Sequence, residues 1–300
     1  MIIVKIHGGL GNQLFQYALG KAVADRNNMP LMLDISGYGR VADRSYGLSP
    51  FSVSAAIASP GDIATLLPPA DGSFLSRVRR KAFYGVQQLL PIEKRAYVRE
   101  PHFHFAPEIL RAGKNAYLDG YWQSQKYFAD IGPEIRKQFA LAAPFGPAAA
   151  AIASDIAKDA RLGRAVSVHV RRGDYVTNPN VTAMNGVCPP EYYRAAAHAM
   201  ANRLGQPPVY YVFSDDIEWV REHMPFLSPA VFVSRPGIAP HEDIALMSRC
   251  SAHILANSTF SWWGAWLDPN PAKIVIAPKE WFRDRSVNTK DVLPPEWIQL

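Results

Sequence analysis

Apolar, strand-like segments alternate with helical ones over residues 165–278, and this alternation limits the fold more than any other feature. The segment AVSVHV (165–170) is rich in β-branched residues, as expected of a strand that is buried on both faces. Further strands are expected at 209–214, 230–234, 252–257 and 273–278, with helices at 190–204, 217–224, 241–250 and 258–267. Such alternation with short turns predicts a parallel sheet with helices on both faces.

The first half of the chain begins in the same way and then becomes irregular. It reads as strand (1–7), glycine turn (8–12), helix (13–28) and strand (30–34), and it regains strand character at 115–122 and helical character at 124–140. Residues 36–115 are rich in Pro, Gly and Ser and predict a long insertion. We therefore expect two Rossmann-like domains facing a central cleft, residues 1–150 with the 36–115 insertion and residues 151–300, because Pro and Gly interrupt the pattern at 143–151.

Composition narrows the class of protein. Of the 300 residues 48% are hydrophobic, which excludes a disordered chain, and the net charge of +6 suits an anionic ligand without identifying one. The two cysteines, Cys188 and Cys250, predict reduced thiols rather than a disulfide framework or a zinc site. Since no run of ~18 apolar residues occurs, we expect no membrane span and a cytoplasmic location.

The glycine turn GGLGNQ (8–13) exposes backbone N–H groups at the start of a helix. It lacks the Lys and Ser/Thr of a Walker loop and the third Gly of the dinucleotide fingerprint. The turn is therefore needed either for packing alone or for binding a ligand. The amides of Asn12 and Gln13 favour a ligand, because amides bind both sugar hydroxyls and phosphate oxygens.

The segment HVRRGDY (169–175) follows a buried strand. The forked guanidinium groups of Arg171 and Arg172 suit a phosphate, and adjacent residues of a strand point to opposite faces. The alternative is a salt bridge within the domain, for example between Arg172 and Asp174. His169 is expected to form a hydrogen bond to a base or a ribose, although a satisfied core histidine is the alternative.

Polar side chains also follow two later strands of this half. One of Asp215 and Asp216 is expected to cap the next helix, and the other to meet a ribose or a purine N–H. Ser258 and Thr259 are good helix caps whose hydroxyls, together with the free backbone N–H groups, also form an anion site. No D-x-D motif occurs and the histidines do not cluster with carboxylates, so we expect no metal site.

Taken together, GGLGNQLFQYALG, HVRRGDY, FSDD and NSTFSWWGAWL resemble, in this order, the α-1,2-fucosyltransferases of bacteria and animals. The four segments span residues 8 to 267, and the second matches the H-x-R-R-x-D motif of a wider fucosyltransferase group. The resemblance implies the two-domain GT-B architecture and inverting transfer of L-fucose from GDP-β-L-fucose to the 2-hydroxyl of a galactoside-type acceptor. It also implies a role in cell-surface glycan synthesis, with no metal or other cofactor.

The resemblance further implies roles for single residues. Arg171 would hold the β-phosphate and stabilise the leaving group, while His169 and either Asp215 or Asp216 would contact guanine and ribose. The other donor-binding residues would be Gly9, Gly11, Asn12, Gln13, Arg172, Asn257, Ser258, Thr259, Phe260 and Ser261. Two candidates remain for the base that takes the acceptor proton: His7, at the end of the first strand, and Asp174, whose role stays open between structural and catalytic.

Three alternatives remain beside this interpretation: transfer of another GDP-sugar or formation of another fucosyl linkage, a nucleotide- or glycan-binding protein without turnover, and nucleic-acid binding. The last is not expected, because Phe83 and Tyr84 are too few for a stacking platform. The basic segment 73–90 places Phe74, Val78, Phe83 and Val86 near one helical face and Arg77, Arg79, Arg80 and Lys81 largely elsewhere. It suits either peripheral contact with the inner face of an anionic membrane or a helix packed on its domain with a solvated basic face.

Overall fold

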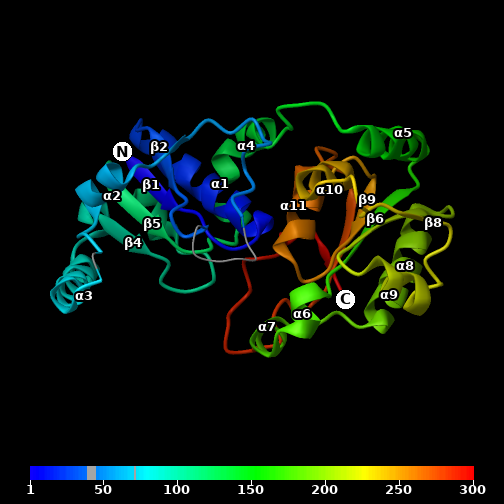
Figure 1. The fold of residues 1–300 in the computed structure, drawn as a ribbon. Helices are drawn as coiled ribbons and strands as arrows, with labels where there is room; N and C mark the ends of the chain where they lie inside the picture. Colours follow the sequence, from blue (N-terminus) through cyan, green and yellow to red (C-terminus); the bar gives the residue numbers. More distant parts are fainter. Residues whose placement is uncertain (39–44, 71) are drawn as a thin grey trace. The chain divides into compact units, whose positions relative to one another are not determined.

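The computed structural model describes residues 1–38, 45–70 and 72–300, and it divides into two compact units. Unit 1 comprises Met1–Phe139 with Lys290–Val292, and unit 2 comprises Ala140–Thr289 with Leu293–Leu300. The boundary expected at 150/151 differs from this division, because it falls inside helix α5 (Pro147–Arg161), which packs on the sheet of unit 2 (Figure 1). The return of 290–292 to unit 1 has a clear reason: the Asp291 carboxylate accepts the backbone N–H of Phe105 and pairs with Lys126.

Unit 1 is built on a five-stranded parallel sheet in the order β3-β2-β1-β5-β4. Its strands are β1 (Ile2–Lys5), β2 (Leu31–Asp34), β3 (Ala56–Ile57), β4 (Tyr97–Arg99) and β5 (Ala116–Asp119). Its helices are α1 (Leu10–Asn27), α2 (Pro60–Leu66), α3 (Phe74–Leu89) and α4 (Gly132–Gln138). The chain runs outward from β1 through β2 and β3 and then returns on the other side of β1. The topological switch therefore lies between β1 and β5, where ligands of such sheets bind.

The stretch 36–115 is more regular than the sequence indicated. Outside residues 39–44 and 71, which lie beyond the described residues, it supplies β3, α2, α3 and β4. The two strands have only two and three residues, so they lack the apolar run by which a strand is found in a sequence. The helix expected over 124–140 is confined to α4 and is preceded by short 3₁₀ turns at 125–127 and 129–131.

Unit 2 contains a six-stranded parallel sheet in the order β11-β10-β9-β6-β7-β8. Its strands are β6 (Ala165–Val170), β7 (Val209–Ser214), β8 (Ala230–Phe232), β9 (Ala252–Ile254), β10 (Ile274–Ala277) and β11 (Ile298–Gln299). Its other helices are α6 (Gly173–Thr177), α7 (Pro179–Asn185), α8 (Pro190–Leu204), α9 (Ile217–His223), α10 (Pro240–Met247) and α11 (Thr259–Leu267). The chain changes direction between β6 and β9, so the switch point of this sheet lies at their carboxyl ends.

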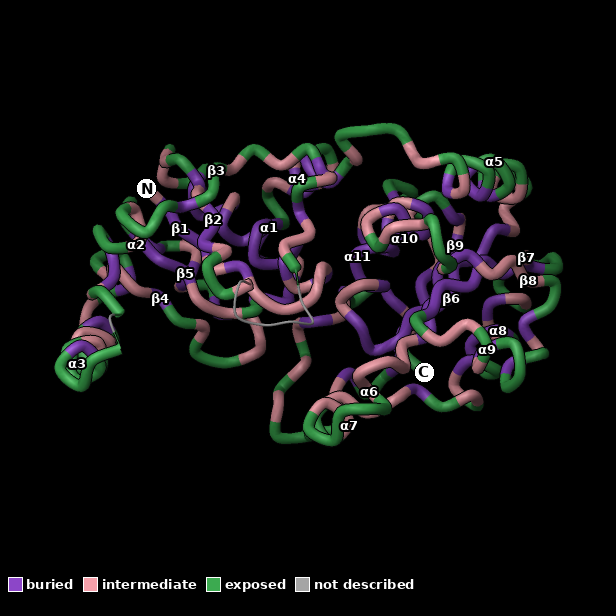
Figure 2. Tube along the Cα trace, in the orientation of Figure 1, coloured by how far each residue is buried: buried purple, intermediate pink, exposed green. Residues whose placement is uncertain are grey.

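Strand β6 is buried along its whole length (Figure 2). Val166, Val168 and Val170 pack in a cluster with the buried side chains of α8, while the alternate residues Ser167 and His169 point to the face covered by α11. Helices thus cover both faces, and the prediction of parallel α/β folding in both halves is confirmed. Within the described part of the chain, no helix combines the length and the apolar character that crossing a membrane requires.

Candidate functional site

Arg171 directly follows β6 and binds two carboxylates. Its Nη2 donates to Oδ1 of Asp174 at 2.6 Å, and its Nη1 lies 2.8 Å from Oδ2 of Asp215. The guanidinium carbon also lies 5.5 Å from the centre of the Tyr175 ring. Because both ion pairs are only partly buried, an anionic ligand can exchange with either carboxylate. The two ion pairs use two of the five N–H donors of the guanidinium, so a diphosphate can bind to the remaining donors or replace a carboxylate.

Arg172 is held on the other face of the strand end. Its Nε donates to Oδ2 of Asp216 at 3.0 Å, and its guanidinium carbon lies 3.6 Å from the centre of the Trp219 ring in α9. The salt bridge considered for Arg172 therefore forms with Asp216 and not with Asp174. Asp216 also caps α9 by accepting the backbone N–H of Trp219 at 3.3 Å, which makes it the capping member of the aspartate pair.

Asp215 joins the two arginines, because its Oδ1 accepts the backbone N–H of Arg172 at 2.8 Å while its Oδ2 pairs with Arg171. This bridge depends on Gly173. A Cβ at that position would lie 2.4 Å from Oδ2 of Asp215, so any larger residue pushes the carboxylate away from Arg171. The glycine of HVRRGDY is thus required by the close approach of Asp215 and not by a turn.

His169 is buried beside this network, and its ring packs in a tilted arrangement against the ring of Phe260, at the start of α11, with 5.4 Å between the ring centres. Burial, and to a lesser degree the charge of Arg171, lowers the pKa of His169 to about 3, so the ring is neutral at pH 7. Its Nδ1 is buried and has no hydrogen-bond partner among the residues that the structure describes. Buried polar atoms in proteins are normally satisfied, so this nitrogen is a candidate contact for a ligand.

The segment 257–261 follows β9 and starts α11. Ser258 caps the helix by accepting the backbone N–H of Phe260 at 3.3 Å. The hydroxyl of Ser261 is fully buried and donates to the carbonyls of Ala256 and Ser258, so it holds the turn and does not face a ligand. Of the five residues expected around phosphate, only Thr259 and Phe260 are partly exposed.

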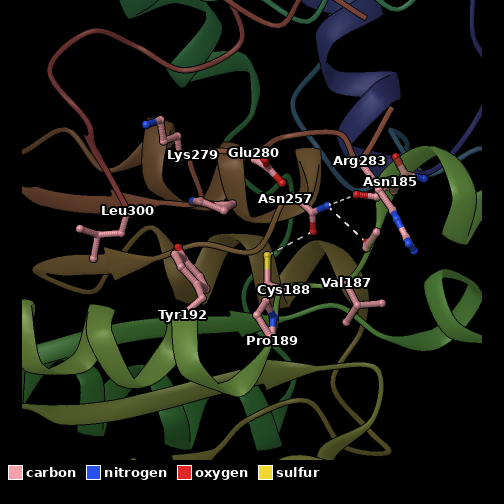
Figure 3. A pocket seen from close by; sticks show the side chains of 12 residues that line it. Asn185, Val187, Cys188, Pro189, Tyr192, Asn257, Lys279, Glu280, Arg283 and Leu300 are labelled. Carbon is pink, nitrogen blue, oxygen red and sulfur yellow. Dashed lines mark hydrogen bonds between the residues drawn. The ribbon is translucent and has the colours of Figure 1, made fainter. Parts of the chain in front are cut away.

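A pocket of about 550 Å³ opens beside this segment, at the carboxyl ends of β9 and β10 (Figure 3). Its walls come from residues 185–189, Tyr192, Asn257 and residues 278–280, with Arg283 at its side. Of these residues, only Asn257 was predicted from the sequence as a site residue. Lys279 and Glu280 follow β10 as Asn257 follows β9. Their position directly after a strand is the sequence feature from which they could have been predicted as site residues.

Asn257 ties the pocket walls together. Its amide donates to the carbonyls of Asn185, Gly186 and Trp281 at 2.8, 3.4 and 3.3 Å, and its oxygen accepts from Sγ of Cys188 at 3.4 Å. The side chain is almost fully buried. It is therefore a structural clamp between these walls.

Replacement of Asn257 by Ala is expected to lower the free energy of unfolding by about 2 kcal/mol, because buried carbonyls lose their donor. Urea unfolding of the two proteins measures this difference. Asn180→Ala, at an exposed position of α7, is the matched control. A loss no greater than that of the control would show that the clamp is dispensable.

In unit 1, His7 lies just beyond β1, at the switch point. Its ring contacts Tyr121 edge-on at 4.7 Å, and its Nε2 is buried without a hydrogen-bond partner among the described residues. Burial, with a contribution from Lys5, lowers the pKa of His7. The imidazole is therefore neutral at pH 7, the state that a proton acceptor requires.

The glycine turn beside His7 connects β1 to α1. Gly8 has a φ of 77°, a left-handed conformation that glycine adopts without strain. Gly9 precedes α1 and Gly11 is buried inside it. Asn12 accepts from Nε2 of Gln123 at 3.0 Å.

Gln13 is buried and donates to the carbonyls of Gly8 and Ser45, while its oxygen accepts the N–H of Gly47. Its amide is thus occupied by backbone in this structure. Gln13 could contact the sugar donor only if these hydrogen bonds were broken.

A serine, a histidine and an aspartate form a chain across the sheet of unit 2. The Oγ of Ser167 lies 2.8 Å from Nδ1 of His253, whose Nε2 lies 3.1 Å from Oδ2 of Asp268. All three side chains are buried, so substrate cannot reach this chain and it is a structural network. Within the described ranges, no group of three or more His, Cys, Asp or Glu side chains is placed to hold a metal ion.

Two parallel α/β units are the GT-B architecture, and solved fucosyltransferases share this fold. NodZ alpha-1,6-fucosyltransferase from Bradyrhizobium, soaked with GDP-fucose, aligns with a TM-score of 0.50 over 89% of this chain and 92% of its own, at 15% identity. An Arabidopsis thaliana FUT1 mutant in complex with GDP aligns with a TM-score of 0.50 over 91% and 69%, at 12% identity.

The chain belongs to glycosyl transferase family 11, whose model matches residues 1–300. It is 30% identical to an alpha-1,2-colitosyltransferase of Escherichia coli over 100% of this chain and 99% of that protein. It is 29% identical to the O-antigen biosynthesis glycosyltransferase WbnK of Escherichia coli, over 98% and 99%. A galactoside alpha-(1,2)-fucosyltransferase 2 of Oryctolagus cuniculus is 26% identical over 89% and 67%. The family resemblance drawn from the motifs is confirmed, and the protein is a glycosyltransferase.

Proposed function

We propose that this glycosyltransferase moves L-fucose from GDP-β-L-fucose to the 2-hydroxyl of a galactoside-type acceptor, with inversion and without a metal, in cell-surface glycan synthesis. The observation that carries the proposal is Arg171, a partly exposed guanidinium at the switch point of unit 2. The identity of the chain to relatives named as α-1,2-glycosyltransferases supports the linkage.

The chemistry assigned to Arg171 is electrostatic. When the bond between fucose C1 and the phosphate oxygen breaks, negative charge grows on the β-phosphate, and a preorganised guanidinium stabilises it. Asp174 and Asp215 hold the fork in place before the donor binds and yield to phosphate when it arrives. The N-terminal turn of α11, with Thr259 and Phe260, adds backbone N–H groups to the same anion.

The nucleoside is assigned to His169 and one of the aspartates after β7. The free Nδ1 of His169 supports this role, whereas every carboxylate oxygen of Asp215 and Asp216 already has a partner. Asn12 and the glycine turn of unit 1 are assigned to the fucose and the acceptor. His7 is assigned as the base that takes the proton of the acceptor hydroxyl, because its Nε2 is neutral and has no partner among the described residues.

A second candidate donor is GDP-colitose, favoured by the E. coli relative that is named a colitosyltransferase. Colitose lacks one ring hydroxyl of fucose, and a site that hydrogen-bonds that hydroxyl discriminates strongly against its absence. We expect kcat/KM for GDP-fucose to exceed that for GDP-colitose at least tenfold.

The assay follows release of GDP in the presence of EDTA with β-galactoside acceptors, and NMR of the product identifies the linkage. A 2-deoxygalactoside is the matched control and should yield no product. Faster turnover of GDP-colitose would reassign the donor. Binding of GDP without turnover of any acceptor would instead identify a non-catalytic nucleotide-binding protein.

A further inference from the structure

Helix α3 of unit 1 is anchored to its domain along one side only. Ser76 donates to the carbonyl of Pro69 at 2.8 Å, and Gln87 accepts the N–H of Ala96 at 2.7 Å. Phe83 and Tyr84 pack against an apolar cluster of the domain. Arg80 turns to the same side, where Nη2 donates to the hydroxyl of Tyr84 at 2.6 Å.

The opposite side of α3 is apolar and open to solvent. Among the described residues, five of the eleven exposed large apolar side chains belong to this helix. They are Phe74 (75% exposed), Leu75 (75%), Val78 (47%), Val86 (54%) and Leu89 (85%). Their spacing, with Ala82 between them, repeats every three or four residues, so they form one stripe along the helix.

This arrangement corrects the helical face expected from the sequence. Phe83 is not part of the exposed stripe, because it packs inward, and Leu75 and Leu89 take its place. Figure 2 shows α3 exposed along most of its length at the edge of unit 1. An amphipathic helix normally buries its apolar stripe in the core. Here the buried side carries Phe83 and Tyr84 together with polar contacts, and no described residue covers the exposed stripe.

Cations flank the stripe. Arg77, Arg79 and Lys81 are exposed, and at 100° per residue Arg79 falls on one edge of the stripe while Arg77 and Lys81 fall on the other. Residues 74–89 contain no Asp or Glu. The exposed side is thus apolar along its middle and positive at both edges.

We infer that α3 lies in the surface of an anionic phospholipid bilayer, with its apolar stripe at the boundary of headgroups and acyl chains and its cations on the lipid phosphates. The 16 residues reach about 24 Å, and with three exposed cations they suit an orientation in the membrane plane. A second copy of this chain is the poorer occupant, because two stripes face to face would bring their like charges together. The inference does not depend on which sugar the enzyme transfers.

The test is co-sedimentation of the full chain with vesicles of phosphatidylcholine containing about one third phosphatidylglycerol, compared with phosphatidylcholine alone. We expect binding to the anionic vesicles only. Joint replacement Arg77→Glu, Arg79→Glu and Lys81→Glu should weaken it at least about a hundredfold, since each cation near such a surface contributes about fivefold. Joint replacement Leu75→Ser, Val78→Ser and Leu89→Ser should abolish it.

Lys158→Glu with Leu162→Ser is the matched control, because both side chains are exposed and belong to unit 2. This control should bind vesicles like the wild type, and every variant should keep its turnover of a soluble acceptor. If no protein turns over the acceptor, the wild type included, the proposed function is contradicted, but the vesicle result still tests the membrane inference. Unchanged vesicle binding by the charge-reversed protein would overturn the inference. The inference would also be overturned if the wild type were a dimer and the serine variant a monomer, because the stripe would then be a dimer interface.

Discussion

Arg171→Ala is expected to weaken the binding of GDP-fucose by at least a hundredfold. Two charge-assisted hydrogen bonds from one guanidinium are worth about 3–6 kcal/mol together, which corresponds to a factor of about 10² to 10⁴. The loss is increased by the carboxylates of Asp174 and Asp215. Without Arg171 they would face the diphosphate unneutralised.

Calorimetry with GDP-fucose in the presence of EDTA measures this effect. Arg171→Lys separates charge from shape: it keeps the charge but loses the fork, so its affinity should fall between those of the wild type and the alanine variant. Arg221→Ala removes a similar arginine from α9, where it packs over the Phe232 ring, and should bind normally. Equal affinity of wild type and Arg171→Ala would mean that HVRRGDY is scaffolding and that the diphosphate binds elsewhere.

His7→Gln is expected to lower kcat by a factor of about 10² to 10⁴, the usual contribution of a general base. The affinity for GDP should stay unchanged, because the nucleoside and the diphosphate are assigned to unit 2. Glutamine retains much of the size of the imidazole but cannot accept the proton. A variant with wild-type kcat would remove His7 from the mechanism.

The pH dependence gives a second readout of the same residue. A base must be neutral, so kcat should fall as the pH falls through the pKa of His7. Burial and Lys5 hold that pKa below the ordinary value of 6.5, and the midpoint of the acid limb should therefore lie below 6.5. The limb should disappear in His7→Gln.

Asp174→Asn distinguishes the other candidate base. Asp174 is tied to Arg171 at 2.6 Å, so we expect its replacement to alter donor affinity while the acid limb of kcat remains. If Asp174→Asn lowers kcat as strongly as His7→Gln is expected to and abolishes the acid limb, Asp174 is the base. Both variants are assayed from about pH 5 to pH 8, the range in which histidine titrates.

Local pattern predicted most of the second half of the chain. The limits expected for one strand and one helix, 165–170 and 190–204, agree with those of β6 and α8, because a segment rich in β-branched residues and a proline start are visible without any partner. The short edge strands β3 and β4 were not visible, because two or three residues carry no periodicity. Their place in the sheet depends on the hydrogen bonds of β2 and β5.

The sequence by itself determined the parallel α/β class, the family, and the presence of two arginines at the end of a buried strand, since all of these follow from residue order. Only the tertiary structure decided which carboxylates those arginines meet. Arg171 reaches Asp215 because β6 and β7 are neighbours in the sheet, and Asp216 rather than Asp215 caps α9. The clamp of Asn257 on residues 185, 186 and 281, and the open apolar stripe of α3, were likewise decided in three dimensions. Strand order and burial arise from contacts between residues far apart in the chain, and no local pattern encodes them.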